Sequence, residues 1–137
     1  MTEETKSKLV SVLKNNTKWP LIIEGASKEN FPTSIVIPAT VPVSELNIIP
    51  EETGYKYPNW LTNVVTKAKK LKRVLVCIDG LDKVSEEEQE KFYGLLKHKS
   101  ISGFRLPEAA QIIITVKNLK KVSKRVLDLS LVFKAGR

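Results

Sequence analysis

Three short apolar runs constrain the fold of this chain more than any other feature of its sequence. They are WPLIIEG at 19–25, VLVCID at 74–79 and QIIITV at 111–116. Each run has the compact apolar pattern of a buried strand. Segments with helical periodicity alternate with the runs. The sequence therefore predicts an α/β fold, a three-layer sandwich around a mainly parallel sheet with right-handed crossovers.

Three amphipathic helices are expected to cover this sheet. Residues 3–15 have acidic residues first and lysines later, with Thr2 as N-cap. Residues 59–73 place their apolar side chains on one face, with Asn59 as cap and a tryptophan near the start as a core anchor. Residues 85–99 begin with a serine and a glutamate in capping-box spacing, which predicts a third helix.

The first half of the chain is harder to assign. Residues 26–58 contain five prolines and are expected to form an irregular surface connection. A β-rich run in it predicts a short edge strand near 34–37, because proline removes a donor from a strand ladder. The end of LDLSLVF, residues 127–133, is expected to be the last strand.

Size and composition are those of one domain with its own core. The chain has 137 residues, of which 42% are apolar, so a core can form without a disulfide or a metal. Its one cysteine, Cys77, lies inside an apolar run and is expected to be an inert core residue. No run approaches the roughly 18 apolar residues of a membrane span, and the N-terminus has no secretory pattern. We therefore expect a cytoplasmic protein without membrane contact.

From Tyr57 to about Phe133 the chain resembles the AAA+ ATPases, particularly the MoxR-like branch. Four segments carry the resemblance: NWL, VLVCIDGLDKV, EEQEKFYGLLKHKSISG and RLPEAAQIIITVKN. In the family, similar segments begin a helix, form the Walker B strand, form the next helix and lead into the sensor strand. Their order and spacing imply a truncated P-loop-NTPase or AAA+-like fold.

The resemblance implies functional roles for a few residues. Asp79 matches the Walker B aspartate, whose family role is to hold Mg²⁺ near the phosphates, but Gly80 stands where the family has its catalytic glutamate. Asn118, or Thr115 nearby, matches the sensor-one position. Leu129 occupies the arginine-finger position, and leucine cannot stabilise transition-state charge.

The phosphate loop is the largest departure from the family pattern. Such a loop needs glycines, a Gly-Lys-Ser/Thr triplet and a helix whose N-terminus faces the phosphates. Gly25 is followed by no second glycine and no such triplet, and Pro32 stands where a helix should begin. We therefore expect no ATP hydrolysis, no cofactor and no metal. Asp79 is then expected to close a turn by accepting N–H groups of the following turn and of the helix near Ser85.

The net charge of +8, from 23 Lys and Arg against 15 Asp and Glu, favours an anionic partner. Two basic clusters stand out, and a parallel sheet would place them on opposite rims. The first contains Lys67, Lys69, Lys70, Lys72 and Arg73, and the second contains Lys117, Lys120, Lys121, Lys124 and Arg125.

Three functions follow from these features. The first is a catalytically inactive AAA+-like domain that binds a protein, as an adaptor or competitor of a related intact ATPase, in the host cytoplasm if the chain is viral. The second is non-specific nucleic-acid binding through the basic clusters. The third is a residual nucleotide-binding switch.

Overall fold

Five parallel strands form the central sheet. The computed structural model describes residues 1–16 and 18–136. The strand order is β2-β5-β8-β1-β9, and all four pairings are parallel. The predicted sheet is confirmed, with β1 inside it and β2 at its edge. The strands are β1 (Leu21–Glu24), β2 (Ile35–Pro38), β5 (Val74–Asp79), β8 (Ala110–Val116) and β9 (Leu131–Lys134).

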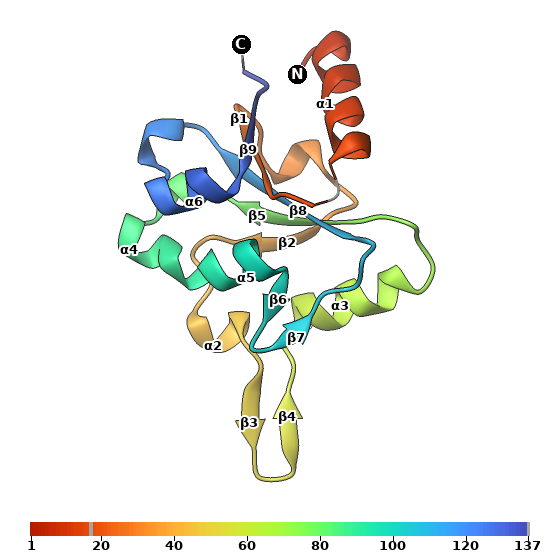
Figure 1. Ribbon diagram of the computed structural model, residues 1–137, viewed down its shortest axis with the longest axis vertical. Helices are drawn as coiled ribbons and strands as arrows, with labels where there is room; N and C mark the ends of the chain where they lie inside the picture. The colour runs from red at the N-terminus through yellow and green to blue at the C-terminus, as the bar shows by residue number, and fades with distance from the viewer. Residues whose placement is uncertain (17, 137) are drawn as a thin grey trace.

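Helices cover both faces of this sheet, so the predicted three-layer α/β sandwich is confirmed. Figure 1 shows α1 (Glu3–Asn15) on one side and α3 (Asn59–Ala68) and α5 (Tyr93–His98) on the other. Neighbouring residues of β1 point into different cores: Leu21 and Ile23 pack with α1, whereas Ile22 packs in the opposite layer. This alternation is the period of two that a strand imposes on its side chains.

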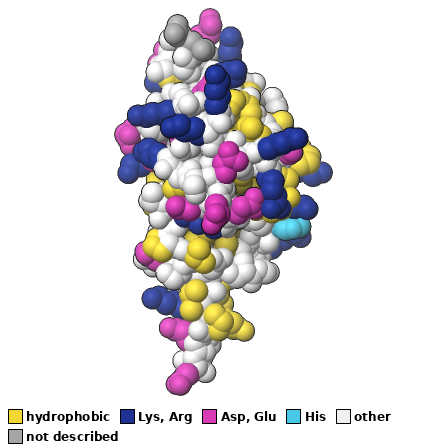
Figure 2. Space-filling view, turned by 90° about the vertical axis from the view of Figure 1, so that its left-hand side faces the viewer, with side chains coloured by type: hydrophobic (Ala, Val, Ile, Leu, Met, Phe, Trp, Pro, Cys, Tyr) yellow, Lys and Arg dark blue, Asp and Glu magenta, His cyan; other side chains and the backbone are white. Residues whose placement is uncertain are grey.

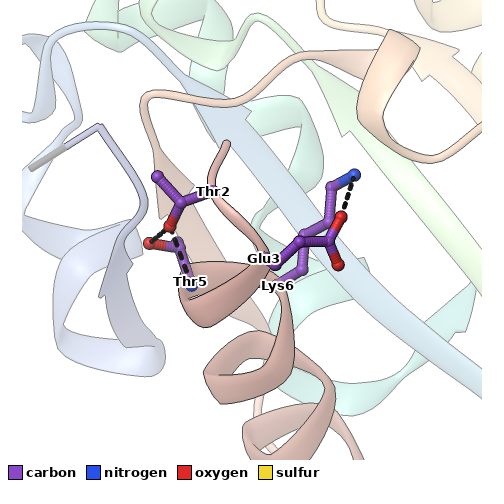
Figure 3. A network of polar contacts seen from close by, with 4 residues as sticks. All are labelled: Thr2, Glu3, Thr5 and Lys6. Atoms are coloured by element: carbon purple, nitrogen blue, oxygen red, sulfur yellow. Dashed lines mark hydrogen bonds and ion pairs between the residues drawn. The ribbon is translucent and has the colours of Figure 1, made fainter.

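The predicted N-cap of α1 is confirmed (Figure 3). The Thr5 backbone N–H donates to Thr2 Oγ1 over 3.1 Å, and the Thr2 hydroxyl donates to Thr5 Oγ1 over 2.9 Å. Lys6 and Glu3 form an exposed ion pair one turn apart, at 3.7 Å. Such a cap satisfies a backbone donor that has no partner inside the helix.

The other two predicted helices are shorter than the sequence pattern indicated. The helix predicted at 59–73 ends at Ala68, its N-cap is Pro58 rather than Asn59, and Leu71 is exposed. It ends early because the chain must turn into β5, which begins only a few residues later. Trp60 is the predicted core anchor, and its indole N–H donates to Leu46 O over 3.0 Å.

The helix predicted at 85–99 is divided into α4 (Glu86–Gln89), the 3-10 turn η3 (Glu90–Phe92) and α5. Ser85 caps it as predicted, since Ser85 Oγ accepts the Glu88 N–H over 3.2 Å. The buried Gln89 side chain donates to Lys121 O over 2.9 Å and accepts the Ser123 N–H over 2.8 Å. These tertiary bonds and the burial of Phe92 accompany the change of helix type.

The connection at 26–58 is more ordered than predicted. It contains the 3-10 turn η1 (Lys28–Asn30), β2, the short helix α2 (Val43–Leu46) and an antiparallel hairpin. The hairpin pairs β3 (Ile49–Glu51) with β4 (Gly54–Lys56) and projects from the body of the molecule (Figure 1). Prolines in this segment mark element boundaries and an edge rather than a structureless loop.

Five further elements follow β5 in the chain. The hairpin of β6 (Ser100–Ile101) and β7 (Phe104–Arg105) and the helix α6 (Lys124–Leu129) were not predicted, because each is too short to show a periodic pattern. Two 3-10 turns, η2 (Leu81–Lys83) and η4 (Leu119–Lys121), follow β5 and β8. None of the helices in the described part of the chain is long and apolar enough to cross a membrane.

Cys77 is a core residue, as predicted. Its side chain is fully buried on β5 and packs with Leu13 and Ile113 in the layer under α1. Burial, with a smaller contribution from the negative charge of Asp79, raises the pKa of the Cys77 thiol to about 12. The thiol is therefore protonated near neutral pH and has the low reactivity of a buried structural cysteine.

Candidate functional site

The C-terminal edge of the sheet is the first place to look for a site. After β1 the chain crosses to β2, which is an outer strand of the sheet, and returns through β5 to β8. The last strand, β9, then pairs on the other side of β1. The strand order therefore reverses beside β1. In open α/β sheets, ligands bind at such a switch point, outside the carboxyl ends of the strands.

Asp79 lies at this edge and is bonded by its own chain. Its Oδ1 accepts the Thr115 hydroxyl over 2.7 Å and the Lys28 backbone N–H over 2.9 Å. Thr115 is buried at the end of β8 and its Oγ1 accepts the Gly80 N–H over 3.2 Å. The prediction that Asp79 closes the following turn is wrong, because the groups that donate to its side chain come from η1 and β8 rather than from that turn or from the helix near Ser85.

Gly80 is required by the backbone that follows β5. Its φ is +75°, a left-handed conformation that L-residues adopt at a cost. A Cβ added there would lie 2.8 Å from Lys83 Cδ, the flexible side chain of the next turn. The glycine at the family's glutamate position therefore fits the local turn, and a glutamate would be strained there.

Two further carboxylates at this edge also accept hydrogen bonds from backbone N–H groups of loops. Glu24 Oε2 accepts the Leu119 N–H over 3.0 Å. Asp82 accepts the N–H groups of Lys117 over 3.0 Å and Asn118 over 2.8 Å. A shared signal was present in the sequence for two of the three acids, since Glu24 and Asp79 each end an apolar run and precede a glycine.

Residues 135–136 pack against the end of β1. Gly25 has φ +89°, and the N–H groups of Ala135 and Gly136 both donate to Glu24 O, at 2.7 and 3.2 Å. A Cβ on Gly25 would lie 2.5 Å from the Gly136 nitrogen. Two backbones are therefore in contact at the end of β1.

The remaining residues implied by the resemblance lie apart from Asp79. Asn118 caps η4, because its Oδ1 accepts the Lys120 N–H over 3.0 Å. Of the two sensor-one candidates, Thr115 is the one bonded to Asp79. Arg125 forms an ion pair with Glu90 at 2.7 Å and lies over the Tyr93 ring, 3.8 Å from its centroid. The adjacent Arg125 guanidinium lowers the pKa of Tyr93.

The two predicted basic clusters lie at opposite edges of the sheet, as expected. The second cluster follows β8 at the C-terminal edge, and acidic side chains are mixed with lysines and arginines on the face of Figure 2, which carries α4 and α6. The first cluster is dispersed. Lys67 donates to Thr33 O over 3.2 Å, Lys69 lines a hollow together with Tyr57, and Lys72 lies just before β5.

Lys72 lines a hollow at the N-terminal edge that the sequence did not predict. We call it the basic hollow. Its volume is about 910 Å³. The tertiary fold collects its cations from segments before β1 and β5, from the end of α5 and from β7, so no run of charge in the sequence marks it. The basic side chains that line it are Lys18, Lys72, Lys97, His98, Lys99 and Arg105.

A second exposed feature, which we call the hairpin surface, is formed by three aromatic residues that lie in or next to the two hairpins. They are Tyr55, Tyr57 and Phe104, with exposed fractions of 64%, 48% and 38%. The rings of Tyr57 and Phe104 meet edge to face with centroids 6.3 Å apart. Apolar side chains gather along the projecting part of the molecule in Figure 2, with acidic side chains toward its tip.

The hairpin surface joins both hairpins into one end of the molecule. Ser102, in the turn between β6 and β7, accepts the Ile48 N–H over 3.1 Å just before β3. A hollow of about 310 Å³ lies beside the aromatic rings, lined by Tyr57, Leu61, Val65, Lys69 and Phe104 among others.

Among residues 1–16 and 18–136, no group of three or more His, Cys, Asp and Glu side chains is arranged to hold a metal ion. Comparison with protein-family models and with curated proteins gave no match.

Proposed function

We propose that this protein is a shortened AAA+-like domain that does not hydrolyse ATP and acts as a protein-binding or assembly factor. The observation that carries the proposal is the bonding of Asp79. In the family that the chain resembles, this carboxylate faces Mg²⁺ and phosphates. Here the Lys28 backbone N–H and the Thr115 hydroxyl both donate hydrogen bonds to Asp79 Oδ1.

The backbone around Asp79 supports the same proposal. The left-handed turn at Gly80 disfavours the glutamate that would orient an attacking water. At Gly25, contact with the Gly136 backbone takes space that a phosphate-binding loop would need. Both features favour an edge that is held closed by the chain itself.

The hairpin surface is the proposed contact with the partner. Tyr and Phe are enriched in protein interfaces, and Tyr is prominent among the residues that dominate binding energy. All three rings are exposed, those of Tyr57 and Phe104 are in contact, and the two hairpins that carry or adjoin them are bonded to each other. The proposed partner is a related intact AAA+ ATPase, for which this chain acts as an adaptor or competitor.

A nucleotide test comes first. The melting temperature of the chain should be unchanged by millimolar Mg-ATP, and no phosphate release should be measured. Because a ligand that binds only the folded state stabilises it, a rise in melting temperature with Mg-ATP would instead support the residual nucleotide switch.

The partner test uses affinity capture from the source cells with three baits. They are the wild type, a hairpin variant (Tyr55→Ser, Tyr57→Ser, Phe104→Ser) and a matched control with three exposed apolar residues changed elsewhere (Val10→Ser, Leu131→Thr, Val132→Thr). The wild type and the control should retain an ATPase that the hairpin variant loses. Capture of no ATPase, or equal loss in the control, would contradict the proposal.

A further inference from the structure

The basic hollow carries an inference that is independent of the proposed protein partner. It lies where three neighbouring strands of the sheet begin, since Lys18, Lys72 and Glu108 come just before β1, β5 and β8. The end of α5 and the strand β7 supply its other cations, Lys97, Lys99 and Arg105. A set of like charges collected from separate segments repels itself in the folded state.

These charges have little compensation within the protein. The ion pairs found between described residues involve none of the cations that line the hollow. Glu108 is the one acidic residue in the lining, and its backbone oxygen accepts a bond from Lys99 Nζ over 3.2 Å. Burial is the main cause that lowers the pKa of Lys99; the nearby charge of Glu108 raises this pKa in part, and that of Arg105 lowers it. An anion in the hollow would offset this repulsion.

An exposed aromatic residue stands beside the hollow. Trp19 is 52% exposed, and Lys18 Nζ lies 5.9 Å from its ring centroid. Asn16 holds the Trp19 backbone on both sides, because Asn16 Oδ1 accepts its N–H over 3.1 Å and Asn16 Nδ2 donates to its carbonyl over 2.8 Å. The ring is therefore attached to fixed backbone, and about half of the residue is exposed although Lys18 lies over the ring.

We propose that the basic hollow and Trp19 form a binding site for single-stranded nucleic acid, with the cations along the phosphate backbone and Trp19 stacked on a base. Proteins that bind single strands without sequence preference combine a cationic groove with aromatic platforms. The volume of about 910 Å³ exceeds what one phosphate needs. Trp19 favours a single strand over a duplex, whose bases are already stacked, and over an acidic peptide, which needs no stacking platform.

The first test is the anisotropy of a labelled oligothymidylate of about 12 nucleotides, within the usual site sizes of about 4 to 16, titrated with the full chain at several salt concentrations. If about four phosphates are contacted, log K should fall with log salt with a slope of about −3, because each contact contributes about −0.7 in single strands. No binding at low salt, or binding indifferent to salt, would overturn the proposal.

A pair of charge variants separates the hollow from net charge alone. The hollow variant (Lys72→Gln, Lys97→Gln, Arg105→Gln) and the matched control at the opposite edge (Lys117→Gln, Lys120→Gln, Lys121→Gln) both lower the net charge from +8 to +5. All six side chains are exposed, so both variants should fold. We expect the hollow variant to lose affinity about tenfold or more with a flatter salt slope, and the control to lose much less. Equal losses would overturn the site.

The role of Trp19 has its own readout. Trp19→Ala should weaken binding about fivefold to a hundredfold, the range for loss of one stacked base, and Trp19→Phe should restore most of it. In a Trp60→Phe background, Trp19 is the only tryptophan, so its fluorescence should be quenched on binding. Unchanged fluorescence together with unchanged Trp19→Ala affinity would overturn the stacking role. Tighter binding of polyglutamate than of the oligonucleotide would overturn the assignment to nucleic acid.

Discussion

The charged side chains at the two edges of the central sheet differ in their bonding partners. At the C-terminal edge, Glu24, Asp79 and Asp82 all accept backbone N–H groups from loops that are distant in the sequence. At the N-terminal edge, the cations of the basic hollow have no ion pairs among the described residues. At the edge where α/β folds usually place their chemistry, three carboxylates are hydrogen-bonded within the protein, whereas the lining of the hollow at the opposite edge is mostly cationic.

The two edges are therefore expected to contribute differently to folding stability and to ligand binding. Bonds from buried or fixed groups to a carboxylate contribute to folding, and leaving one of those groups unpaired costs free energy. Exposed lysines contribute little to folding but dominate attraction to an anion. Substitutions at the C-terminal edge should therefore change the free energy of unfolding, and substitutions at the N-terminal edge should change binding.

The largest effect is expected for Asp79→Ala. The change leaves the buried Thr115 hydroxyl and the Lys28 N–H without their acceptor, so the free energy of unfolding should fall by about 2 to 3 kcal/mol. Asp79→Asn keeps an oxygen at Oδ1 and should lose about half as much. Urea denaturation measures both, and labelling of the buried Cys77 thiol should become faster in the alanine variant.

A gain of stability in Asp79→Ala would contradict the closed edge. Residues that serve catalysis or ligand binding are often held in unfavourable surroundings, and their removal then stabilises the protein. A stabilised Asp79→Ala variant would therefore indicate that Asp79 has a functional rather than a structural role, and it would favour nucleotide binding by this chain.

Gly80→Glu tests whether the turn excludes the family's catalytic acid. At φ +75° an L-residue costs about 1 to 2 kcal/mol, and we expect a loss of that size with no ATPase activity gained. Gly80→Ala should lose a similar amount, because the cost comes from the backbone. Gly80→Asn should lose less, since asparagine tolerates the left-handed region. A neutral Gly80→Glu would show that the turn can hold an acid.

Asp82→Ala should have a smaller effect than Asp79→Ala. It removes the acceptor of the Lys117 and Asn118 N–H groups, but both residues are exposed and water can replace the carboxylate, so about 1 kcal/mol is expected. Hydrogen exchange of those two amides should become faster while exchange in β1 stays slow. Unchanged exchange at Lys117 and Asn118 would contradict the bonding described.

The smallest change of stability is expected at the N-terminal edge. The hollow variant (Lys72→Gln, Lys97→Gln, Arg105→Gln) should alter the free energy of unfolding by no more than about 0.5 kcal/mol, as is usual for exposed positions. Because the cations repel one another, added salt should stabilise the wild type more than this variant. A loss of unfolding free energy as large as that of Asp79→Ala would show that the two edges contribute equally to stability, which would contradict the difference described above.

Part of this architecture could be predicted from local sequence alone. The runs at β1, β5 and β8 are apolar on both sides because both faces of those strands are buried, and such a pattern needs few assumptions to interpret. The caps at Thr2 and Ser85 could also be predicted locally, because donor and acceptor are only three residues apart. Short elements such as β6, β7 and α6 lack a full period and were not predicted.

The candidate sites depended on contacts that no local pattern contains. The sequence placed Asp79 at a strand end, but its partner Lys28 was unpredictable because η1 reaches it only after the β1–β2 crossover is formed. Lys18, Lys97 and Arg105 are separated in the sequence. The parallel register of β5, β8 and β1, together with the crossover through α5 and β7, brings their segments around one hollow. Local hydrophobic period determined the strands, whereas the strand order decided which carboxylates are satisfied and which cations remain available.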